Sequence, residues 1–249
     1  MQYGICPLST VPVKITPEES TEMISQLLFG EHFKILESRK YWSRIRVAFD
    51  KTEGWILNRQ MAFITDEEYI QIDKSVHRYT SDLISYVENG NQLLIPIVLG
   101  SSINNSKTLA IKFEGNAVQS KQLKADLIKT ALLYLNSPEL HGGKTPFGID
   151  ASGFTQMVYR INGYCLLRTA EAQATQGDAL SFVEESEAGD LAFFDNSNGV
   201  IDHVGIIMDN NYVIHVNGMV RIDRLDHTGI FNNDLRNYTH KLRVIKKII

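Results

Sequence analysis

One stretch, Pro146 to Gly163, constrains the fold of this chain more than any other. It reads PFGIDASGFTQMVYRING and predicts a loop that turns into a helix at Asp150. An aspartate is a favoured N-cap because its carboxylate accepts free backbone N–H groups of the first turn. Apolar residues then recur at helical spacing at Phe154, Val158 and Ile161. Asn162-Gly163 predicts the end of the helix.

The first position of this helix is chemically informative. The helix dipole lowers the pKa of a cysteine thiol placed there and favours the reactive thiolate. This chain has Ala151 instead, which cannot attack a substrate. Ser152 lies about 100° further around the helix, so its hydroxyl is expected to point away from a base aligned with position 151. Cys165 follows the end of the helix. The stretch therefore predicts a nucleophile position without a nucleophile.

The second half of the chain has an α+β pattern. Residues 121–136 have apolar side chains at helical spacing and precede the capped helix. Three strand patterns follow at 190–194, 203–208 and 212–216, and a last one lies at 242–245. Helices followed by antiparallel strands are typical of an α+β domain.

Two histidines lie in neighbouring strand patterns. His203 and Gly205 lie on the face opposite to Val204 and Ile206, and a three-residue turn at 209–211 would place His215 directly across from Gly205. A two-residue turn would break this alignment.

Three interpretations of the pair remain open from the pattern. The two rings could be a catalytic base and the group that orients it, or two unrelated histidines on a solvated face. They could also be two metal ligands, but no third Cys, His or carboxylate is evidently spaced to complete a site. We therefore predict no metal ion and no cofactor. Four other histidines lie in polar surroundings and are interpreted as surface residues: His32, His77, His227 and His240.

The first half reads as short strands separated by turns. Residues 1–65 predict a small β-barrel, in which Ser43–Val47 alternates polar and apolar side chains. Residues 66–73 are acidic and predict a short helix. Residues 79–118 give a weaker β pattern, with Pro96 in a run that is therefore expected at an edge. No Gly/Ser-rich linker is present, so we expect these parts to pack together.

Composition excludes several classes of partner. The chain has 249 residues, of which 43% are hydrophobic and 22% charged, as is ordinary for a soluble globular protein. Its net charge of −4 gives no reason to expect nucleic acid or an anionic membrane. The N-terminus lacks the pattern of an export signal, so we expect a cytoplasmic protein unless a signal was trimmed. Cys6 and Cys165 form no metal or redox motif, and two buried thiols are expected rather than a disulfide between them.

These motifs together resemble the NlpC family of papain-like cysteine peptidases, which cleave peptidoglycan stem peptides. The matching segments are GG-x-x-PFGID-x-SGF at 142–154, AGDLAFFD at 188–195, HVGIIM at 203–208 and IH at 214–215. Further upstream, SQLLFGEHFKILE, YWSRIRV and GWI resemble a bacterial SH3-like domain. The whole order is similar to the subgroup of γ-D-glutamyl-L-diamino-acid endopeptidases. It implies two small SH3-like barrels, at 1–65 and 66–118, followed by a papain-like domain at 119–249.

The resemblance also implies roles for individual residues. His203 corresponds to the catalytic base and His215 to the residue that orients it. Active members carry a cysteine where this chain has Ala151; its thiolate attacks an amide carbonyl, and the acyl-enzyme is then hydrolysed. Asp150 and Ser152 would flank the substrate, a short stem peptide with a free N-terminus, with Asp150 near its amine.

Departures from the family pattern lie in the segments that line its cleft. The family usually has Pro-Tyr-Leu-Trp-Gly-Gly, and this chain has Glu139 and His141 at the two aromatic positions. The segment Leu-Pro-Arg-Asp appears here with Arg168 kept and Thr169 in place of the aspartate. These four residues are our candidates for substrate contacts, along with Asp150 and Ser152.

Three hypotheses follow from Ala151. The favoured one is a pseudoenzyme that binds a cell-wall peptide or a protein partner without cleaving it, because the changes at 139, 141 and 169 accompany the missing cysteine. The second is an active endopeptidase in which the cysteine was deliberately replaced by alanine. The third is a non-catalytic adaptor that docks proteins through its SH3-like domains, which fold analogy alone cannot establish.

Overall fold

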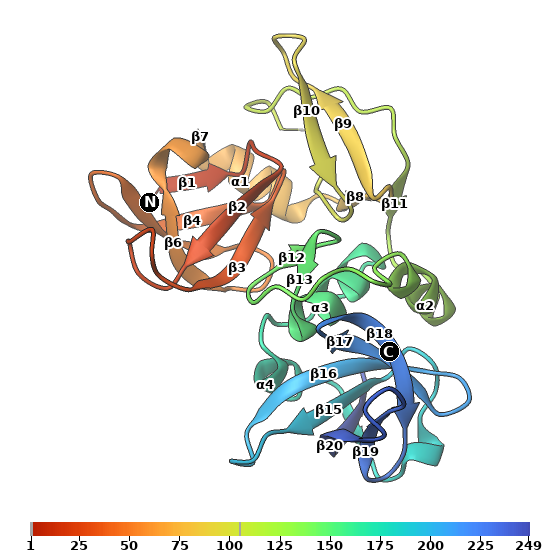
Figure 1. Cartoon of the computed structure of the whole chain (residues 1–249). Helices are drawn as coiled ribbons and strands as arrows, with labels where there is room; N and C mark the ends of the chain where they lie inside the picture. Colours follow the sequence, from red (N-terminus) through yellow and green to blue (C-terminus); the bar gives the residue numbers. More distant parts are fainter. Residues whose placement is uncertain (1, 105) are drawn as a thin grey trace. The chain divides into compact units, whose positions relative to one another are not determined.

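The computed structural model describes residues 2–104 and 106–249, which form two compact units (Figure 1). The first unit contains the chain up to Lys121 together with His141–Pro146. The second contains Gln122–Leu140 and Phe147–Ile249. Each unit has its own core, and each is described by itself.

A seven-stranded antiparallel sheet forms the N-terminal barrel of the first unit. Its strands follow the spatial order β3-β2-β6-β5-β4-β1-β7. Their bounds are β1 (Gln2–Ile5), β2 (Thr10–Lys14), β3 (Met23–Leu28), β4 (His32–Ser38), β5 (Trp42–Val47), β6 (Glu53–Leu57) and β7 (Ala62–Ile64), with a 3-10 turn η1 at Asn58–Gln60. The predicted alternation is confirmed in β5, where Ser43, Ile45 and Val47 are buried and the arginines between them are exposed. Inward-facing aliphatic residues fill the barrel.

The rest of the first unit contains one helix and short strand pairs. Helix α1 (Asp66–Lys74) begins after the N-cap Thr65, whose side chain accepts from the Glu68 N–H, as the acidic run predicts. The remaining strands are β8 (Arg78–Thr80), β9 (Ile84–Glu88), β10 (Leu94–Val98), β11 (Ala117–Gln119) and β12 (Lys144–Thr145). Strands β9 and β10 form one two-stranded sheet and β8 and β11 another, so Pro96 in β10 lies at an edge as predicted.

One hydrophobic cluster joins the barrel to this second region. Phe29 of the barrel and Ile72 of α1 share a core with Val87 and Ile97 of the β9–β10 hairpin. The barrel and the region after residue 65 thus share a core within the first unit. Whether 66–118 is a second SH3-like barrel stays a prediction, because its described strands form separate pairs.

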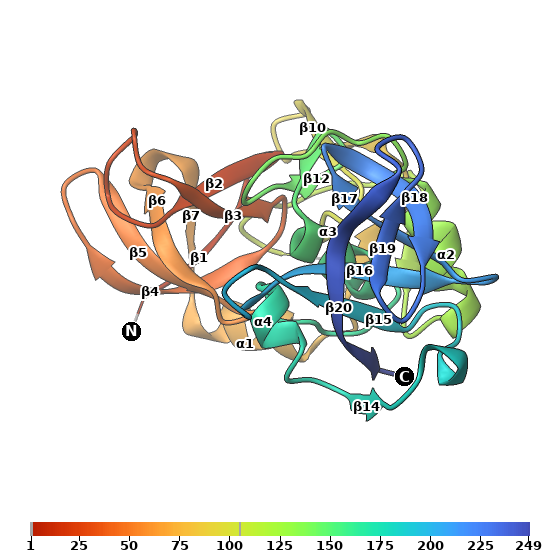
Figure 2. The same ribbon diagram turned by 60° about the horizontal axis from the view of Figure 1, so that its bottom comes forward.

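The second unit combines helices with a closed antiparallel sheet. The strand order is β14-β20-β15-β16-β17-β18-β19, and β19 also pairs with β20, which closes a barrel of six strands (Figure 2). Its strands are β13 (Gly148–Ile149), β14 (Asp178–Leu180), β15 (Leu191–Asp195), β16 (Ile201–Met208), β17 (Tyr212–Asn217), β18 (Met219–Leu225), β19 (Gly229–Asn232) and β20 (Asn237–Lys247). Its helices are α2 (Lys124–Leu132), α3 (Ala151–Ile161) and α4 (Ala170–Gln173), with a 3-10 turn η2 at Val183–Glu185. The α+β prediction is therefore confirmed.

Helix α2 is shorter than the predicted 121–136. Leu127 and Ala131 are fully buried, but Leu123 is 76% exposed and Leu135 is 40% exposed. After Leu132 the backbone tightens into i+3 hydrogen bonds, from the Tyr134 N–H to the Ala131 carbonyl and from the Leu135 N–H to the Leu132 carbonyl. Leu123 and Leu135 therefore have the sequence spacing of core-facing helix residues, but their side chains do not face the core.

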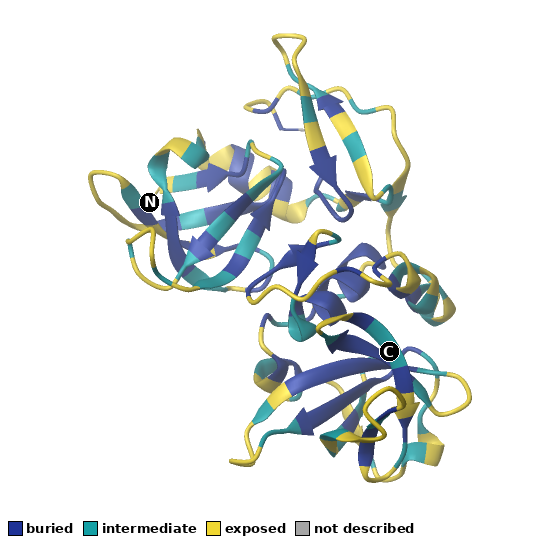
Figure 3. Cartoon of the chain, in the orientation of Figure 1, coloured by how far each residue is buried: buried dark blue, intermediate teal, exposed yellow. Residues whose placement is uncertain are grey.

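The central elements of the second unit are buried on both faces. Helix α3 packs against β16 and β17, and the opposite face of these strands lines the barrel core (Figure 3). Among the described residues no helix has the length and apolar character needed to cross a membrane.

Candidate active site

Helix α3 begins at Ala151, as the capping pattern predicts. Asp150 has extended backbone angles, and its Oδ1 accepts a hydrogen bond of 2.6 Å from the Gly153 N–H. Ala151 is partly exposed at the first helical position. Asn162 is the C-cap. The position at which the sequence analysis expects a nucleophile is thus the first residue of α3, and its side chain is a methyl group.

The carboxylate of Asp150 is also bound by an arginine. Arg168 donates from Nη1 to Oδ1 at 2.9 Å and from Nη2 to Oδ2 at 2.6 Å, a bidentate ion pair between largely buried side chains. Ser152 joins the cluster, since its Oγ donates to Asp150 at 3.2 Å and accepts from Arg168 at 3.0 Å. The structure therefore brings three predicted residues together and commits the Ser152 hydroxyl to the ion pair.

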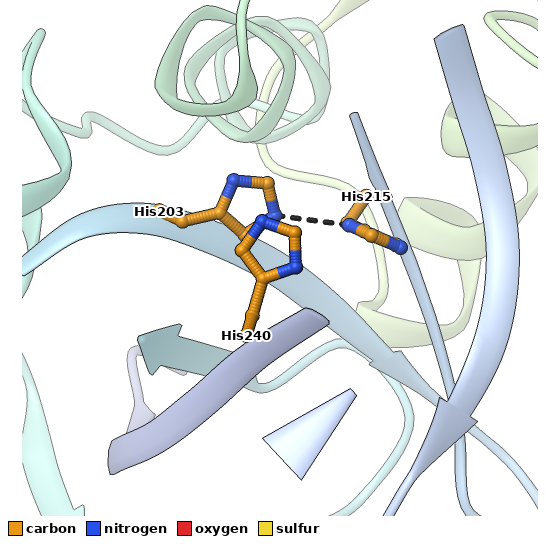
Figure 4. Close-up of side chains that lie close together, drawn as sticks. All are labelled: His203, His215 and His240. Atoms are coloured by element: carbon orange, nitrogen blue, oxygen red, sulfur yellow. Dashed lines mark hydrogen bonds between the residues drawn. The ribbon is translucent and has the colours of Figure 1, made fainter. Parts of the chain in front are cut away.

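The predicted register of the histidine strands is confirmed. Gly205 pairs with His215 across β16 and β17, and His203 lies one step diagonally away. Position 205 needs a glycine, because a Cβ there would lie 3.0 Å from the Cβ of His215 and 2.6 Å from the Val213 side chain. The His203 Nε2 lies 2.9 Å from the His215 Nδ1 (Figure 4). The interpretation of two unrelated histidines on a solvated face is wrong, because this face lines the barrel interior.

A carboxylate extends the pair into a chain of hydrogen bonds. Asp223 on β18 has its Oδ2 3.0 Å from the His215 Nε2, and it also accepts from Arg221 Nε at 2.7 Å and Nη2 at 3.0 Å. Because a carboxylate accepts, the His215 Nε2 carries a proton and its Nδ1 is free to accept from His203. Burial opposes the ionisation of Asp223, but the hydrogen bonds from His215 and Arg221 outweigh it and lower its pKa.

All three rings of the cluster favour the neutral form. Burial holds the pKa of His203 well below its ordinary value, and the neighbouring rings of His240 and His215 add to this. Burial also lowers the pKa of His215, although Asp223 opposes the shift. The pKa of His240 falls to about 4, again chiefly through burial. At neutral pH His203 is therefore able to accept a proton.

His240 is the residue that the sequence interpretation missed. Its ring stacks on His203 with centroids 3.9 Å apart and 23° between the planes. It lies on β20, which pairs with β15, and β15 in turn pairs with the strand of His203. The expectation of a surface residue is correct only in part, because the ring is partly buried where the sheet closes on itself. The same expectation is wrong for His32, which is buried beside Asp73.

The structure gives the other predicted site residues local roles. Thr169 is the N-cap of α4, accepting from the Ala172 N–H at 3.3 Å. Glu139 is exposed and accepts from the Gly218 N–H at 2.6 Å; its charge also acts to raise the pKa of His215. His141 belongs to the first unit, where its Nε2 lies 2.6 Å from Glu22.

The cysteines are only partly as expected. Neither cysteine is in a disulfide; Cys6 is buried in the first unit, whereas Cys165 is exposed in the second. The expectation of two buried thiols is therefore wrong for Cys165, which follows the end of α3 where the chain returns to the surface.

Comparisons with known proteins agree with both halves of the fold. Residues 137–238 match the model of the NlpC/P60 family, and residues 15–61 match that of the bacterial dipeptidyl-peptidase SH3 domain. A γ-D-glutamyl-L-lysine dipeptidyl-peptidase of Bacillus subtilis is 27% identical over 77% of this chain and 71% of its own length. Dipeptidyl-peptidase 6 of Lysinibacillus sphaericus is 23% identical over 88% of this chain and 90% of its own length.

A solved structure extends the likeness to the whole fold. The crystal structure of an NlpC/P60 family protein from Bacillus cereus superposes with a TM-score of 0.82. The match covers 99% of both chains at 16% sequence identity. At this identity the likeness shows that the order of domains and the fold are shared.

Proposed function

Because the chain carries an NlpC/P60 domain behind a bacterial SH3 domain and is homologous to γ-D-glutamyl-L-lysine dipeptidyl-peptidases, we propose that it is a non-catalytic member of this peptidoglycan peptidase family. It binds a short stem peptide with a free N-terminus, or a protein partner that occupies the same site, and releases it unchanged. The observation that carries this proposal is Ala151 at the first position of a helix that is otherwise built for a nucleophile.

The chemistry available to the site supports binding without turnover. Acyl transfer by this family's mechanism needs an atom that attacks the amide carbonyl. Ala151 offers none, and the Ser152 hydroxyl is held between Asp150 and Arg168. His203 retains a neutral ring that can accept a proton, but no acidic side chain is placed at position 151 to supply one. The proton relay therefore has no nucleophile to activate.

Binding determinants remain at the start of α3. Arg168 and Asp150 form a compact pair of opposite charges, with the carboxylate side chain 17% exposed. A peptide amine would approach Asp150, and a peptide carboxylate would approach Arg168. Thr169 caps α4, as an aspartate at this position would also do. Compared with the aspartate of the family pattern, the threonine therefore lacks a negative charge but keeps the cap. We infer that the site tolerates a neutral group where the family pattern carries a carboxylate.

One observation favours the alternative of an active endopeptidase with a replaced cysteine. The hydrogen bonds from His203 through His215 to Asp223 are complete, with successive distances of 2.9 Å and 3.0 Å. A site that has lost catalysis has no need of a complete relay. The two hypotheses differ in what happens when a thiol is supplied.

The test restores the nucleophile. The full chain and its Ala151→Cys variant are incubated with L-Ala-γ-D-Glu-L-Lys and with L-Ala-γ-D-Glu-diaminopimelate, and dipeptide release is followed by mass spectrometry. We expect the unaltered chain to bind one of these peptides in calorimetry and neither chain to cleave it. Cleavage by Ala151→Cys that disappears in Ala151→Cys/His203→Ala would overturn the proposal in favour of the endopeptidase.

A separate measurement addresses the adaptor hypothesis. An Arg168→Met variant removes the charge that would hold a peptide carboxylate and leaves the SH3-like unit unaltered. We expect it to weaken peptide binding, with Arg243→Met as a surface control of the same charge change in the second unit. If no peptide binds the unaltered chain, peptide recognition is wrong and docking through the SH3-like unit becomes the better explanation.

A further inference from the structure

Three imidazole rings meet at one end of the barrel in the second unit. His203 comes from β16, His215 from β17 and His240 from β20. One ring nitrogen from each lies within 4.8 Å of the other two, and Figure 4 shows the His240 ring over the His203 ring with His215 beside them. The peptidase relay accounts for His203 and His215 only. His240 has no part in that relay, and its position calls for a separate explanation.

We propose that His203, His215 and His240 form a binding site for a divalent transition-metal ion of the zinc class. Imidazole nitrogen is a preferred ligand of zinc, copper and nickel, whereas magnesium and calcium prefer oxygen. Three histidines also form a known type of zinc site, in which the fourth position stays open for water or another ligand. A carboxylate of a bound peptide is one group that can fill this position.

The ring positions are close to those that a metal requires. Two nitrogens at about 2.0–2.1 Å from a tetrahedral zinc ion lie roughly 3.3 Å apart. The His203 Nε2 and His215 Nδ1 are 2.9 Å apart, so this pair is already near the required spacing. The partly buried His240 ring stacks on His203, so it has to turn before its nitrogen points at the same ion. Metal binding would replace the hydrogen bond between the first two rings.

Groups around the cluster leave the required nitrogens available. The His215 Nε2 faces Asp223, which fixes the tautomer with a free lone pair on Nδ1. Asp223 is held in turn by Arg221. A carboxylate behind a histidine is the usual outer partner of a metal ligand. The His240 Nδ1 lies 2.9 Å from the Thr239 Oγ1, which leaves Nε2 to bind the ion.

Two of the three rings are buried. His215 is fully buried and His203 is 8% exposed, so two ligands are shielded from water. His240 is the most exposed of the three. Its ring also contacts Phe194, which keeps it near the cluster in the absence of an ion. A proton relay formed by His203 and His215 does not require the ring of His240 beside it.

The test is direct metal binding by the full chain after treatment with a chelator. Zinc is titrated in calorimetry, and cobalt is added separately because its visible absorption reports a tetrahedral site with nitrogen ligands. We expect one zinc ion per chain and an intense cobalt spectrum. His240→Gln should weaken zinc binding by about tenfold or more, and Asp223→Asn by about 10–100-fold through the outer partner. His227→Gln, an exposed histidine of the same unit, should bind as the unaltered chain does.

Two outcomes would overturn the proposal. One is the absence of stoichiometric zinc binding in the unaltered chain. The other is equal affinity in His240→Gln and His227→Gln, which would place any bound ion elsewhere. Far-ultraviolet circular dichroism of each metal-free variant checks that it is folded. The titrations contain no peptide, so their failure leaves the proposed peptide binding unaffected, and a failure of peptide binding leaves the metal site unaffected.

Discussion

The ion pair at the start of α3 offers a quantitative test of how this site is held together. Asp150 caps the helix through Gly153 and binds Arg168 with both carboxylate oxygens. Asp150→Asn keeps a side chain that caps helices well but removes the charge, whereas Asp150→Ala removes both. Comparing the two variants therefore separates the cap from the ion pair.

The expected magnitude follows from burial. Breaking a buried ion pair costs about 3–5 kcal/mol, and an exposed pair is worth about 0–1 kcal/mol. The Arg168 side chain is 7% exposed and that of Asp150 is 17% exposed, which places this pair nearer to the buried limit. We expect Asp150→Asn to lower the free energy of unfolding by about 2–4 kcal/mol. Asp150→Ala should cost about 1 kcal/mol more for the lost cap.

The assay is urea unfolding followed by two probes. Far-ultraviolet circular dichroism reports both units, whereas tryptophan fluorescence reports the first, because Trp42 and Trp55 both lie there. Thr169→Ala is the matched control, since it removes the N-cap of α4 without touching an ion pair and should cost about 1 kcal/mol. An Asp150→Asn variant within about 0.5 kcal/mol of the unaltered chain would refute the reasoning.

Two further predictions concern buried groups in each unit. Lys144 and Glu31 form an ion pair at 3.1 Å, with side chains 1% and 2% exposed. Lys144→Met leaves the buried Glu31 without its partner and should destabilise the first unit by about 3–5 kcal/mol, whereas Lys144→Met/Glu31→Gln should cost clearly less. Equal losses of stability in thermal unfolding would contradict this. In the second unit, burial lowers the pKa of His240 from 6.5 to about 4. Between these two pH values the histidine is protonated in the unfolded chain but neutral in the folded one, so stability is lost as pH falls from 6.5 towards 4. His240→Gln should flatten the pH dependence of the unfolding free energy in this window relative to His227→Gln, and identical slopes would show that this ring does not contribute.

Local patterns in the sequence were sufficient for much of this site. The cap at Asp150 and the stop at Asn162 depend on neighbouring residues only, so the bounds of α3 follow from the chain itself. The cross-strand pairing of Gly205 with His215 depends on a three-residue turn and on the two-residue period of strands. Both are short-range effects that a single sequence contains.

The remaining parts of the site depend on contacts between distant segments. Asp223 meets His215 because β18 folds back along β17, and a charged residue in a strand pattern does not reveal the partner it will face. Arg168 follows α3 by several residues, and only the path of the chain returns its guanidinium to Asp150. Sequence periodicity gives the face of a residue but not the identity of its neighbours.

The sequence by itself determined where α3 begins, because the cap at Asp150 and the apolar spacing that follows it are local features. Tertiary structure alone decided the surroundings of the histidines. Closure of the sheet through β19 and β20 placed the histidine face in the barrel interior and brought His240 against His203. The physical reason is that helix caps and strand periods are local, whereas burial is set by which strands pair when the barrel closes.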